Sequence, residues 1–382
     1  MQAVSSSRVL VSDGRIVPAT VAWDGASIVH VEEGAHAALD AGDMLVLPGM
    51  VDLHGDAFER QVMPRPGVAF DMDVALAETD RQLVANGITT AFHAVTFSFE
   101  PGLRGGDAVR DFMAAMSRLR GRLACDTRVH LRHEAYNIDA VDEILGWIAD
   151  GAVDLLAFND HTPPLVEKAR TGKSLLRFVE RTGLDPAAFA ALLLSVGERA
   201  GEVEGANARL AEAARRAGLP MASHDDETPE MRAAFRELGS SICEFPKTTA
   251  TAAAARACSE ASVLGAPNVV RGGSQSGAID ALRAIRAGLC DVLASDYYYP
   301  ALLLAPFRVA AEAGLDFARC WDLVSANPAS AVGLRDRGSL AAGKRADILV
   351  VDDRDARMPR VAAVVAAGRP AMVDLSVMRS RR

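Results

Sequence analysis

The chain has 382 residues, of which 50% are hydrophobic and 24% charged, and its formal net charge is −9. This composition is typical of a protein with a hydrophobic core, and the acidic balance argues against a general binder of nucleic-acid backbones. The apolar runs are well below the roughly 18 residues that a membrane-spanning helix needs, so no membrane protein is expected.

The amino-terminal residues lack a basic start followed by an apolar stretch, so the sequence predicts no secretory signal. Five cysteines are scattered along the chain without a C-x-x-C pair. This pattern is typical of reduced thiols rather than of a disulfide framework or a structural zinc site. We therefore expect the protein in the cytoplasm.

Both ends of the chain show the alternation that is typical of short strands. Residues 8–32 alternate apolar and polar positions and are interrupted by two Asp-Gly turn dipeptides. Residues 343–369 repeat this pattern. Because neither end can bury a sheet face alone, we predict that residues 1–47 and 340–382 form one small β-sandwich domain.

The middle of the chain alternates apolar runs with helical patterns, which is typical of parallel strands joined by crossover helices. We predict eight strands, at Met50–His54, Thr89–Ala94, Arg128–Glu134, Asp154–Asn159, Pro220–His224, Ser241–Phe245, Asn268–Gly272 and Asp291–Ser295. Eight strand–helix units over residues 48–339 predict an α/β fold, a (β/α)8 TIM-like barrel, with an open eight-stranded sheet as the alternative.

Two connections between the strands can be interpreted further. Asp73 is the expected N-cap of a helix over Val74–Asn86, and Gly87 supplies a left-handed stop. The longest connection, residues 162–219, holds two helical segments rich in Ala and Leu. We expect this helical insertion to be a lid or a dimer element, so the sequence leaves a homodimer open.

Potential metal ligands gather at the predicted strand ends, where a barrel places its active site. His54 and Asp56 lie two residues apart, and Gly55 lets the backbone come close. Two such donors on one face suit a divalent metal. His224 and Asp296 end their own strands, and a buried aspartate is costly without a cation or a proton. We predict these four side chains as metal ligands and Asp296 also as the catalytic general base.

The remaining strand-end donors carry a weaker signal. Glu134 ends the third predicted strand, where it either holds a metal or forms a salt bridge with a neighbouring basic residue. His161 follows the fourth strand and is also a candidate ligand. His130 and His133 alternate with Glu134 in the direction they face, so not all three can point inward. His93 is expected either in the core or behind the metal ligands.

Several motifs together resemble a known family. The run PGMVDLH at 48–54, Asp296 after the eighth strand and the divided terminal sheet resemble the amidohydrolase superfamily of metal-dependent hydrolases. Further motifs resemble one branch, the ribose 1-methylphosphonate 5-triphosphate diphosphatases of carbon–phosphorus lyase pathways. These are MPRPG at 63–67, GITT at 87–90, DHTP at 160–163, SHDD at 223–226, NVVRGGS at 268–274 and SDYY at 295–298.

This resemblance implies one or two divalent metals and hydrolytic release of pyrophosphate from a phosphorylated ribose, the small-molecule partner that it predicts. Zinc is the expected metal, with manganese and iron(II) as alternatives. Two positions differ from the expected pattern: Gln275 stands where a histidine is expected, and Tyr299 adds a third tyrosine.

A polyphosphate substrate must be bound by hydrogen-bond donors and cations within the site itself, because the chain as a whole is acidic. Residues 272–277 are expected to follow the seventh strand and precede a helix, where backbone N–H groups bind phosphate, although a simple tight turn is the alternative. The candidate substrate-binding residues are Arg65, Arg132, Lys247, Arg271, Gly273, Ser274 and Gln275. Two other functions remain open, a C–N hydrolase of the same superfamily and a non-catalytic component of a phosphonate-degrading assembly.

Overall fold

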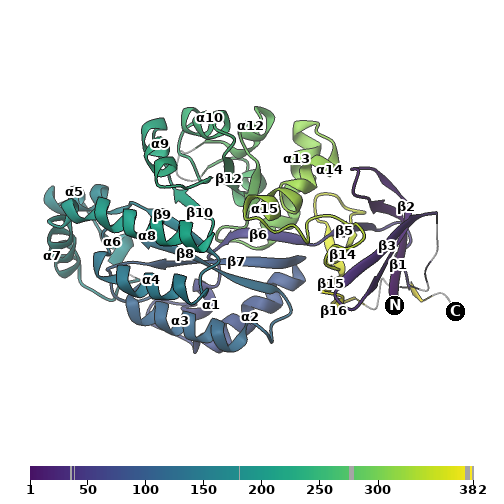
Figure 1. The fold of residues 1–382 in the computed structure, drawn as a ribbon, viewed down its shortest axis with the longest axis horizontal. Coiled ribbons are helices and arrows are strands. Elements are labelled where there is room, and N and C mark those ends of the chain that lie inside the picture. Colours follow the sequence, from purple (N-terminus) through teal and green to yellow (C-terminus); the bar gives the residue numbers. More distant parts are fainter. Residues whose placement is uncertain (35–36, 38, 180, 275–278, 375–378, 381–382) are drawn as a thin grey trace.

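The computed structural model of the chain describes residues 1–34, 37, 39–179, 181–274, 279–374 and 379–380. It contains two sheets (Figure 1): one is built from the middle of the chain and covered by helices, and the other is built from both ends. Among the described residues, none of the helices combines the length and the hydropathy needed to cross a bilayer.

The middle of the chain forms a parallel sheet of eight strands that pair in chain order. They are β6 (Met50–Gly55), β7 (Ile88–Phe97), β8 (Asp126–Glu134), β9 (Leu155–Asn159), β10 (Met221–His224), β11 (Ile242–Glu244), β12 (Ala261–Gly265) and β13 (Val292–Ala294). An isolated parallel bridge between Gly55 and Asp296 joins the ends of β6 and β13. The sheet is therefore a nearly closed barrel, as predicted, and not an open sheet.

The seventh strand lies elsewhere than predicted. Asn268–Gly272 was expected to be extended, but the strand is β12, and the predicted segment largely forms helix α11 (Ala266–Arg271). Pro267 lies in the first turn of this helix, and Gly272 ends it with a φ of +80°. A short apolar run such as Val269–Val270 has no periodicity that separates a strand from a helix, which explains the error.

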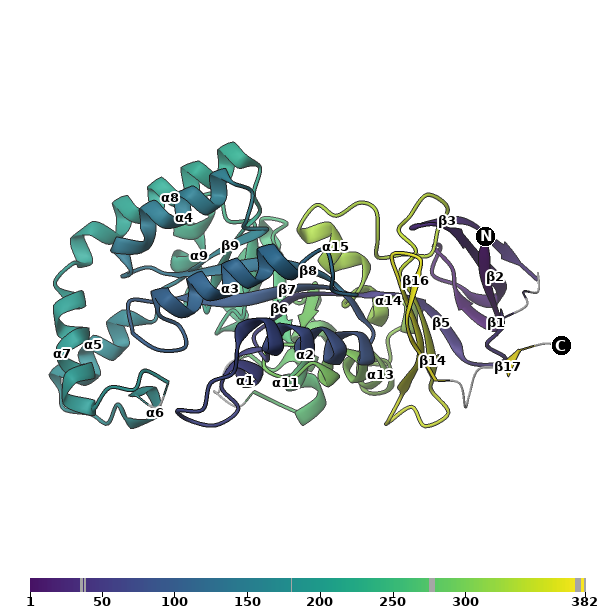
Figure 2. The same ribbon diagram turned by 90° about the horizontal axis from the view of Figure 1, so that it is seen from below.

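Helices cover the outside of the barrel, as the two views in Figures 1 and 2 show. Those of the first half are α1 (Glu59–Val62), α2 (Met72–Ala85), α3 (Gly106–Leu119), η1 (Ile138–Ala140) and α4 (Val141–Ala149). Those of the second half, besides α11, are α9 (Pro229–Glu237), α10 (Thr249–Ala257), α12 (Ala281–Arg286), α13 (Pro300–Ala313), α14 (Phe317–Asp322) and α15 (Ala326–Ala331).

The predicted N-cap of α2 is wrong by two residues. Asp71 caps the helix, and its carboxylate accepts hydrogen bonds from the N–H groups of Asp73 and Val74. Asp73 instead lies in the first turn and pairs with Arg118 of α3 at 2.5 Å. Aspartate is favourable both at the N-cap and in the first turn, so the sequence alone does not show which of the two residues caps the helix. Gly87 has the expected left-handed backbone, with a φ of +81°.

The long connection after β9 is helical throughout much of its length. It contains α5 (Thr162–Arg170), α6 (Leu176–Val179), α7 (Pro186–Gly197), η2 (Ala200–Glu202) and α8 (Val203–Ala217). Buried side chains of α8 belong to the hydrophobic cluster that lines the barrel helices. Those of α5, α6 and α7 form a separate cluster that includes Phe189 and Leu193. The role of this insertion as lid or dimer element stays a prediction.

Both ends of the chain meet in the second sheet. Its strands are β1 (Gln2–Leu10), β2 (Ile16–Asp24), β3 (Ser27–Glu33), β4 (Leu39–Asp40), β5 (Leu45–Pro48), β14 (Ile348–Asp352), β15 (Arg360–Ala366), β16 (Arg369–Val373) and β17 (Arg379–Ser380). Strand β5 pairs with both β1 and β14, and it leads directly into β6. The Trp23 indole donates to the Gly368 carbonyl at 3.0 Å, so the two halves of the sheet face each other around one core.

Candidate metal centre and active site

Histidine and carboxylate side chains converge at the carboxyl ends of the barrel strands, where barrel enzymes carry their active sites. Three groups have ligand atoms that all lie within 4.8 Å of one another: His54 with Asp56 and Asp296, His54 with His130 and Glu244, and His161 with His224 and Asp225. His54 belongs to two of these groups. Of the ligands predicted from the sequence, the groups contain all except Glu134.

The first group sits where the barrel closes. The backbone N–H of Asp296 donates to the carbonyl of His54 at 2.8 Å, and the N–H of Asp56 donates to the carbonyl of Asp296 at 3.0 Å. Asp296 has a φ of +55°, a strained conformation for a residue other than glycine. These backbone bonds fix the two carboxylates next to the His54 imidazole.

A buried aspartate that the sequence did not reveal supports this junction. The Asp52 carboxylate accepts hydrogen bonds from the backbone N–H of Ser295 at 2.9 Å and from its hydroxyl at 2.5 Å. Gly55 is required here, because an added Cβ would lie 2.8 Å from Asp52 Oδ2 and 3.0 Å from the ring of Tyr299. Asp52 thus holds the end of β13 against β6.

Glu244 lies at the centre of the second group. Its Oε2 atom is 3.1 Å from His54 Nδ1, 3.3 Å from His224 Nδ1 and 3.6 Å from His130 Nε2. The side chain is fully buried, and its Oε1 atom has no hydrogen-bond partner among the described residues. Glu244 is not among the ligands predicted from the sequence, although it lies one residue before the end of the sixth predicted strand and ends the observed strand β11.

In the third group, His161 bridges two carboxylates. Its Nδ1 is 3.3 Å from Glu134 Oε2, and its Nε2 is 3.3 Å from Asp225 Oδ2. Burial lowers the pKa of His161, but the contacts with Asp225 and Glu134 outweigh burial and raise it to about 9. Asp225 also pairs with Lys247 at 2.6 Å. The acidic loop after His224 therefore contributes one residue to the site.

A guanidinium lies among these donors. Arg132 is buried, and its Nη2 is 2.8 Å from His224 Nε2, while its Nη1 is 3.9 Å from Asp56 Oδ2. A cavity of about 330 Å³ opens here and is lined by Arg132, Lys247 and Ser274 together with metal-donor residues of all three groups. Cationic and metal-binding groups thus share one space.

The other predicted substrate contacts are not part of the lining of this cavity or lie outside the described residues. Arg65 is in an exposed turn, and Arg271 is exposed and donates to the Tyr297 hydroxyl at 3.3 Å. Gly273 follows α11 and not the seventh strand, so the expected placement of its loop is wrong. Gln275 lies outside the described residues. The predicted roles of these residues stay predictions.

The donor set fits a divalent cation. Burial lowers the pKa of His54 and His224 well below the usual range, which favours the neutral imidazole, the form that binds a metal. The Glu244 Oε1 atom is buried without a hydrogen-bond partner among the described residues, which calls for a cation or another polar group. Imidazole nitrogens with carboxylate oxygens are a donor set that zinc accepts.

Metal binding is expected to weaken in acid. Burial, followed by the charge of Asp56, raises the pKa of Asp296 to about 7 in the metal-free protein. Below this pH the carboxyl keeps a proton that the metal must displace, so affinity falls about tenfold per pH unit for each displaced proton. Zinc titrations at pH 6, 7 and 8 against a competing chelator test this expectation. Equal affinity at pH 6 and pH 8 would contradict it.

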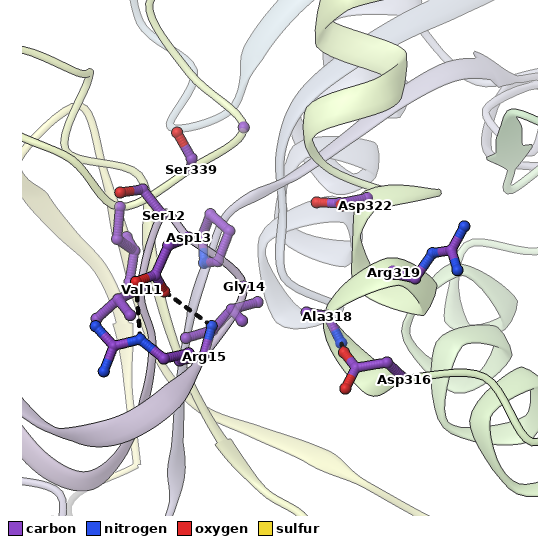
Figure 3. Close-up of a pocket in the computed structure, with 14 residues that line it drawn as sticks. Val11, Ser12, Asp13, Gly14, Arg15, Asp316, Ala318, Arg319, Asp322 and Ser339 are labelled. Carbon is purple, nitrogen blue, oxygen red and sulfur yellow. Dashed lines mark hydrogen bonds and ion pairs between the residues drawn. The ribbon is translucent and has the colours of Figure 1, made fainter.

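A second cavity, of about 510 Å³, lies at the opposite end of the barrel, between the terminal sheet and α14 (Figure 3). It is lined by Pro48, which precedes β6, so it faces the amino ends of the strands. Asp13 pairs with Arg15 at 2.8 Å, and Asp316 caps α14. Its lining contains no histidine. It is therefore not the candidate active site.

Comparisons with known proteins agree with this geometry. Residues 45–379 match the Amidohydrolase family. The alpha-D-ribose 1-methylphosphonate 5-triphosphate diphosphatase of Escherichia coli (strain K12) is 33% identical over 328 residues, which cover 83% of this chain and 86% of that protein.

Solved structures show the same fold. The N-acetyl-D-glucosamine-6-phosphate deacetylase from Mycobacterium smegmatis has a TM-score of 0.64 at 17% identity and covers 97% of this chain and 100% of its own. The atrazine chlorohydrolase from Arthrobacter aurescens TC1, complexed with zinc, has a TM-score of 0.62 at 15% identity, with coverages of 98% and 96%. The chain belongs to the amidohydrolase family, and it is a hydrolase of this metal-dependent family.

Proposed function

We propose that this hydrolase releases pyrophosphate from α-D-ribose 1-methylphosphonate 5-triphosphate, a step of phosphonate degradation in carbon–phosphorus lyase pathways. The observation that carries the proposal is that Arg132 and Lys247 line the same cavity as the metal donors. A polyphosphate needs such cations, whereas a neutral amide does not. The 33% identity to the Escherichia coli diphosphatase over most of both chains supports this substrate.

The proposed metal ligands are the residues that converge at the strand ends: His54, Asp56, Glu134, His161, His224 and Asp296. Glu244 and Asp225 join them as further candidates because of their contacts. A divalent ion held there supplies Lewis acidity and makes water a stronger acid. Zinc is the proposed metal because it accepts both imidazole and carboxylate, with manganese or iron(II) as alternatives.

The side chains that line the cavity carry out proton transfer and charge stabilisation in the proposed reaction. Water adds to the α-phosphorus, the bond from this phosphorus to the bridging α–β oxygen breaks, and pyrophosphate leaves with the electron pair of that bond. The Asp296 carboxylate, raised in pKa by burial, takes the proton of the water. Arg132 and Lys247 offset the charge that develops on the phosphate oxygens. Asp225 holds the Lys247 ammonium in place at 2.6 Å.

Product analysis tests the proposal. The purified protein is reconstituted with zinc and incubated with ribose 1-methylphosphonate 5-triphosphate, and pyrophosphate and orthophosphate are quantified separately. We expect one pyrophosphate per substrate, no orthophosphate, and loss of both turnover and bound metal after chelation. Metal-loaded protein that releases neither product would contradict the proposal and favour a C–N hydrolase, a deaminase or an amidase.

The cytoplasm is the proposed location, supported by five free cysteines, of which only Cys258 is exposed. Thiols that are free and mostly buried are typical of a reducing compartment. A homodimer remains a prediction from the insertion.

A further inference from the structure

We propose that a cavity beside the metal centre, walled by the insertion, binds the ribosyl phosphonate end of the substrate, with Lys168 as the cation that holds the phosphonate. We call it the side cavity. It has a volume of about 540 Å³, and its walls include Thr96 of β7, Asp160 after β9, and Lys168 and Phe178 of the insertion. This inference rests on the proposed function.

The side cavity adjoins the metal-centre cavity. Asp225 and Lys247 line both, and the side cavity is also lined by His161 of the third donor group and by Glu134, which contacts His161. The metal-centre cavity alone, at about 330 Å³, is near the lower end of the range of about 300–1,000 Å³ for ligand pockets. The two adjoining cavities together offer room for a ribose that carries a triphosphate at one end and a phosphonate at the other.

Among the described lysines and arginines that line the side cavity, Lys168 is the cation that no described carboxylate neutralises, since Lys247 pairs with Asp225 at 2.6 Å. Arg181 is neutralised by Glu100 through contacts of 2.6 and 3.1 Å, and Arg104 is neutralised by Glu59 through two contacts of 3.0 Å. Lys168 makes no ion pair with a described carboxylate. Its ammonium lies 5.2 Å from the centre of the Phe178 ring, a contact that leaves its N–H donors free for an anion.

Two unpaired oxygens in the same cavity suit the hydroxyls of a sugar. The Thr96 side chain is only 4% exposed, and its hydroxyl has no hydrogen-bond partner among the described residues. Asp160 Oδ1 is also buried without a partner there. Buried polar atoms are normally paired, and each of these two oxygens can accept a hydrogen bond from a ribose hydroxyl. The side cavity thus offers contacts for both the ring and the phosphonate.

This placement fixes the direction of the substrate. The ribose and its phosphonate lie against the insertion, the α-phosphorus lies at the metal donors, and the pyrophosphate end lies towards Ser274 and Tyr297 in the metal-centre cavity. The insertion is then part of the binding site and determines which 5-triphosphates are good substrates.

The test compares two substrates that differ only at the phosphonate. Lys168→Met is assayed with ribose 1-methylphosphonate 5-triphosphate and with ribose 5-triphosphate. We expect KM for the first to rise at least about tenfold, because a charge-assisted hydrogen bond is lost, and KM for the second to stay within about twofold. The expected kcat values change little. Lys173→Met, which removes an exposed lysine of the same insertion, is the matched control and should behave as wild type.

Thr96→Val provides an independent measurement. Because both substrates carry a ribose, loss of this hydroxyl should raise KM for both by similar factors. Equal effects of Lys168→Met on the two substrates, or no effect on either, would overturn the assignment of Lys168 to the phosphonate.

A binding measurement separates this inference from the proposed reaction. Ribose 1-methylphosphonate 5-phosphate, which carries the phosphonate but no pyrophosphate, is titrated into zinc-loaded wild type and Lys168→Met. Weaker binding to the variant supports the side cavity even if neither triphosphate is hydrolysed, a result that would overturn the proposed function alone. Equal affinity for both proteins would overturn the side cavity while leaving pyrophosphate release intact.

Discussion

Asp296→Asn is expected to lower kcat for pyrophosphate release by about 10²–10⁴-fold, the range for loss of a general base. The carboxylate is fixed by backbone bonds between β6 and β13, and it lies with Asp56 and His54 in one ligand group. An amide keeps the shape of the side chain but takes no proton and is a poorer ligand. Steady-state kinetics together with metal analysis of the purified variant measure both consequences.

The matched control is Asp322→Asn. Asp322 is a partly buried aspartate of α14 that lines the remote cavity of Figure 3. Burial raises its pKa as well, so the control shares the chemistry of Asp296 without its position. Equal losses in the two variants, or full activity of Asp296→Asn with normal metal content, would show that Asp296 is not the base.

Glu244→Gln is expected to lower metal affinity about 10–100-fold, the effect seen when groups that orient metal ligands are removed. One carboxylate oxygen contacts His54, His130 and His224, and the neutral amide can satisfy these imidazoles only in part. Activity at limiting zinc should fall by a similar factor and recover partly in excess zinc. Competition with a chromogenic chelator measures the affinity directly.

Glu237→Gln serves as the control for Glu244, because it makes the same substitution at an exposed position at the end of α9. Its metal affinity should equal that of wild type. Unchanged zinc affinity in Glu244→Gln, with the protein folded, would remove Glu244 from the metal centre and leave it as a buried structural carboxylate.

The barrel and the terminal sheet could be predicted because their signals are periodic and repeated along the chain. Crossover units recur through the middle, and Asp-Gly turns divide the amino-terminal strands. Strand ends that carry a histidine or an aspartate, such as His54 and Asp296, were identified because a donor at that place is costly without a partner. These signals are formed by residues that are close together in the chain, so they can be recognised from the sequence alone.

What the sequence could not supply depends on contacts between distant segments. The role of Asp52 can be recognised only in the structure, because Ser295, 243 positions later, donates two hydrogen bonds to its carboxylate. Arg132 was predicted as a phosphate contact, but its position against His224 follows from the way β8 and β10 are arranged around β9. Glu244 differs from these two residues, because it could have been predicted from the sequence. Its position near the end of a predicted strand is as informative as that of Asp296.

The most direct test of the central claim is the position of oxygen incorporated from water. Turnover of ribose 1-methylphosphonate 5-triphosphate by the zinc-loaded protein in H₂¹⁸O, followed by ³¹P NMR, locates the phosphorus that water attacks. Attack at the α-phosphorus places the label in ribose 1-methylphosphonate 5-phosphate and leaves the released pyrophosphate unlabelled, as the account predicts. Label in pyrophosphate or in orthophosphate would contradict it.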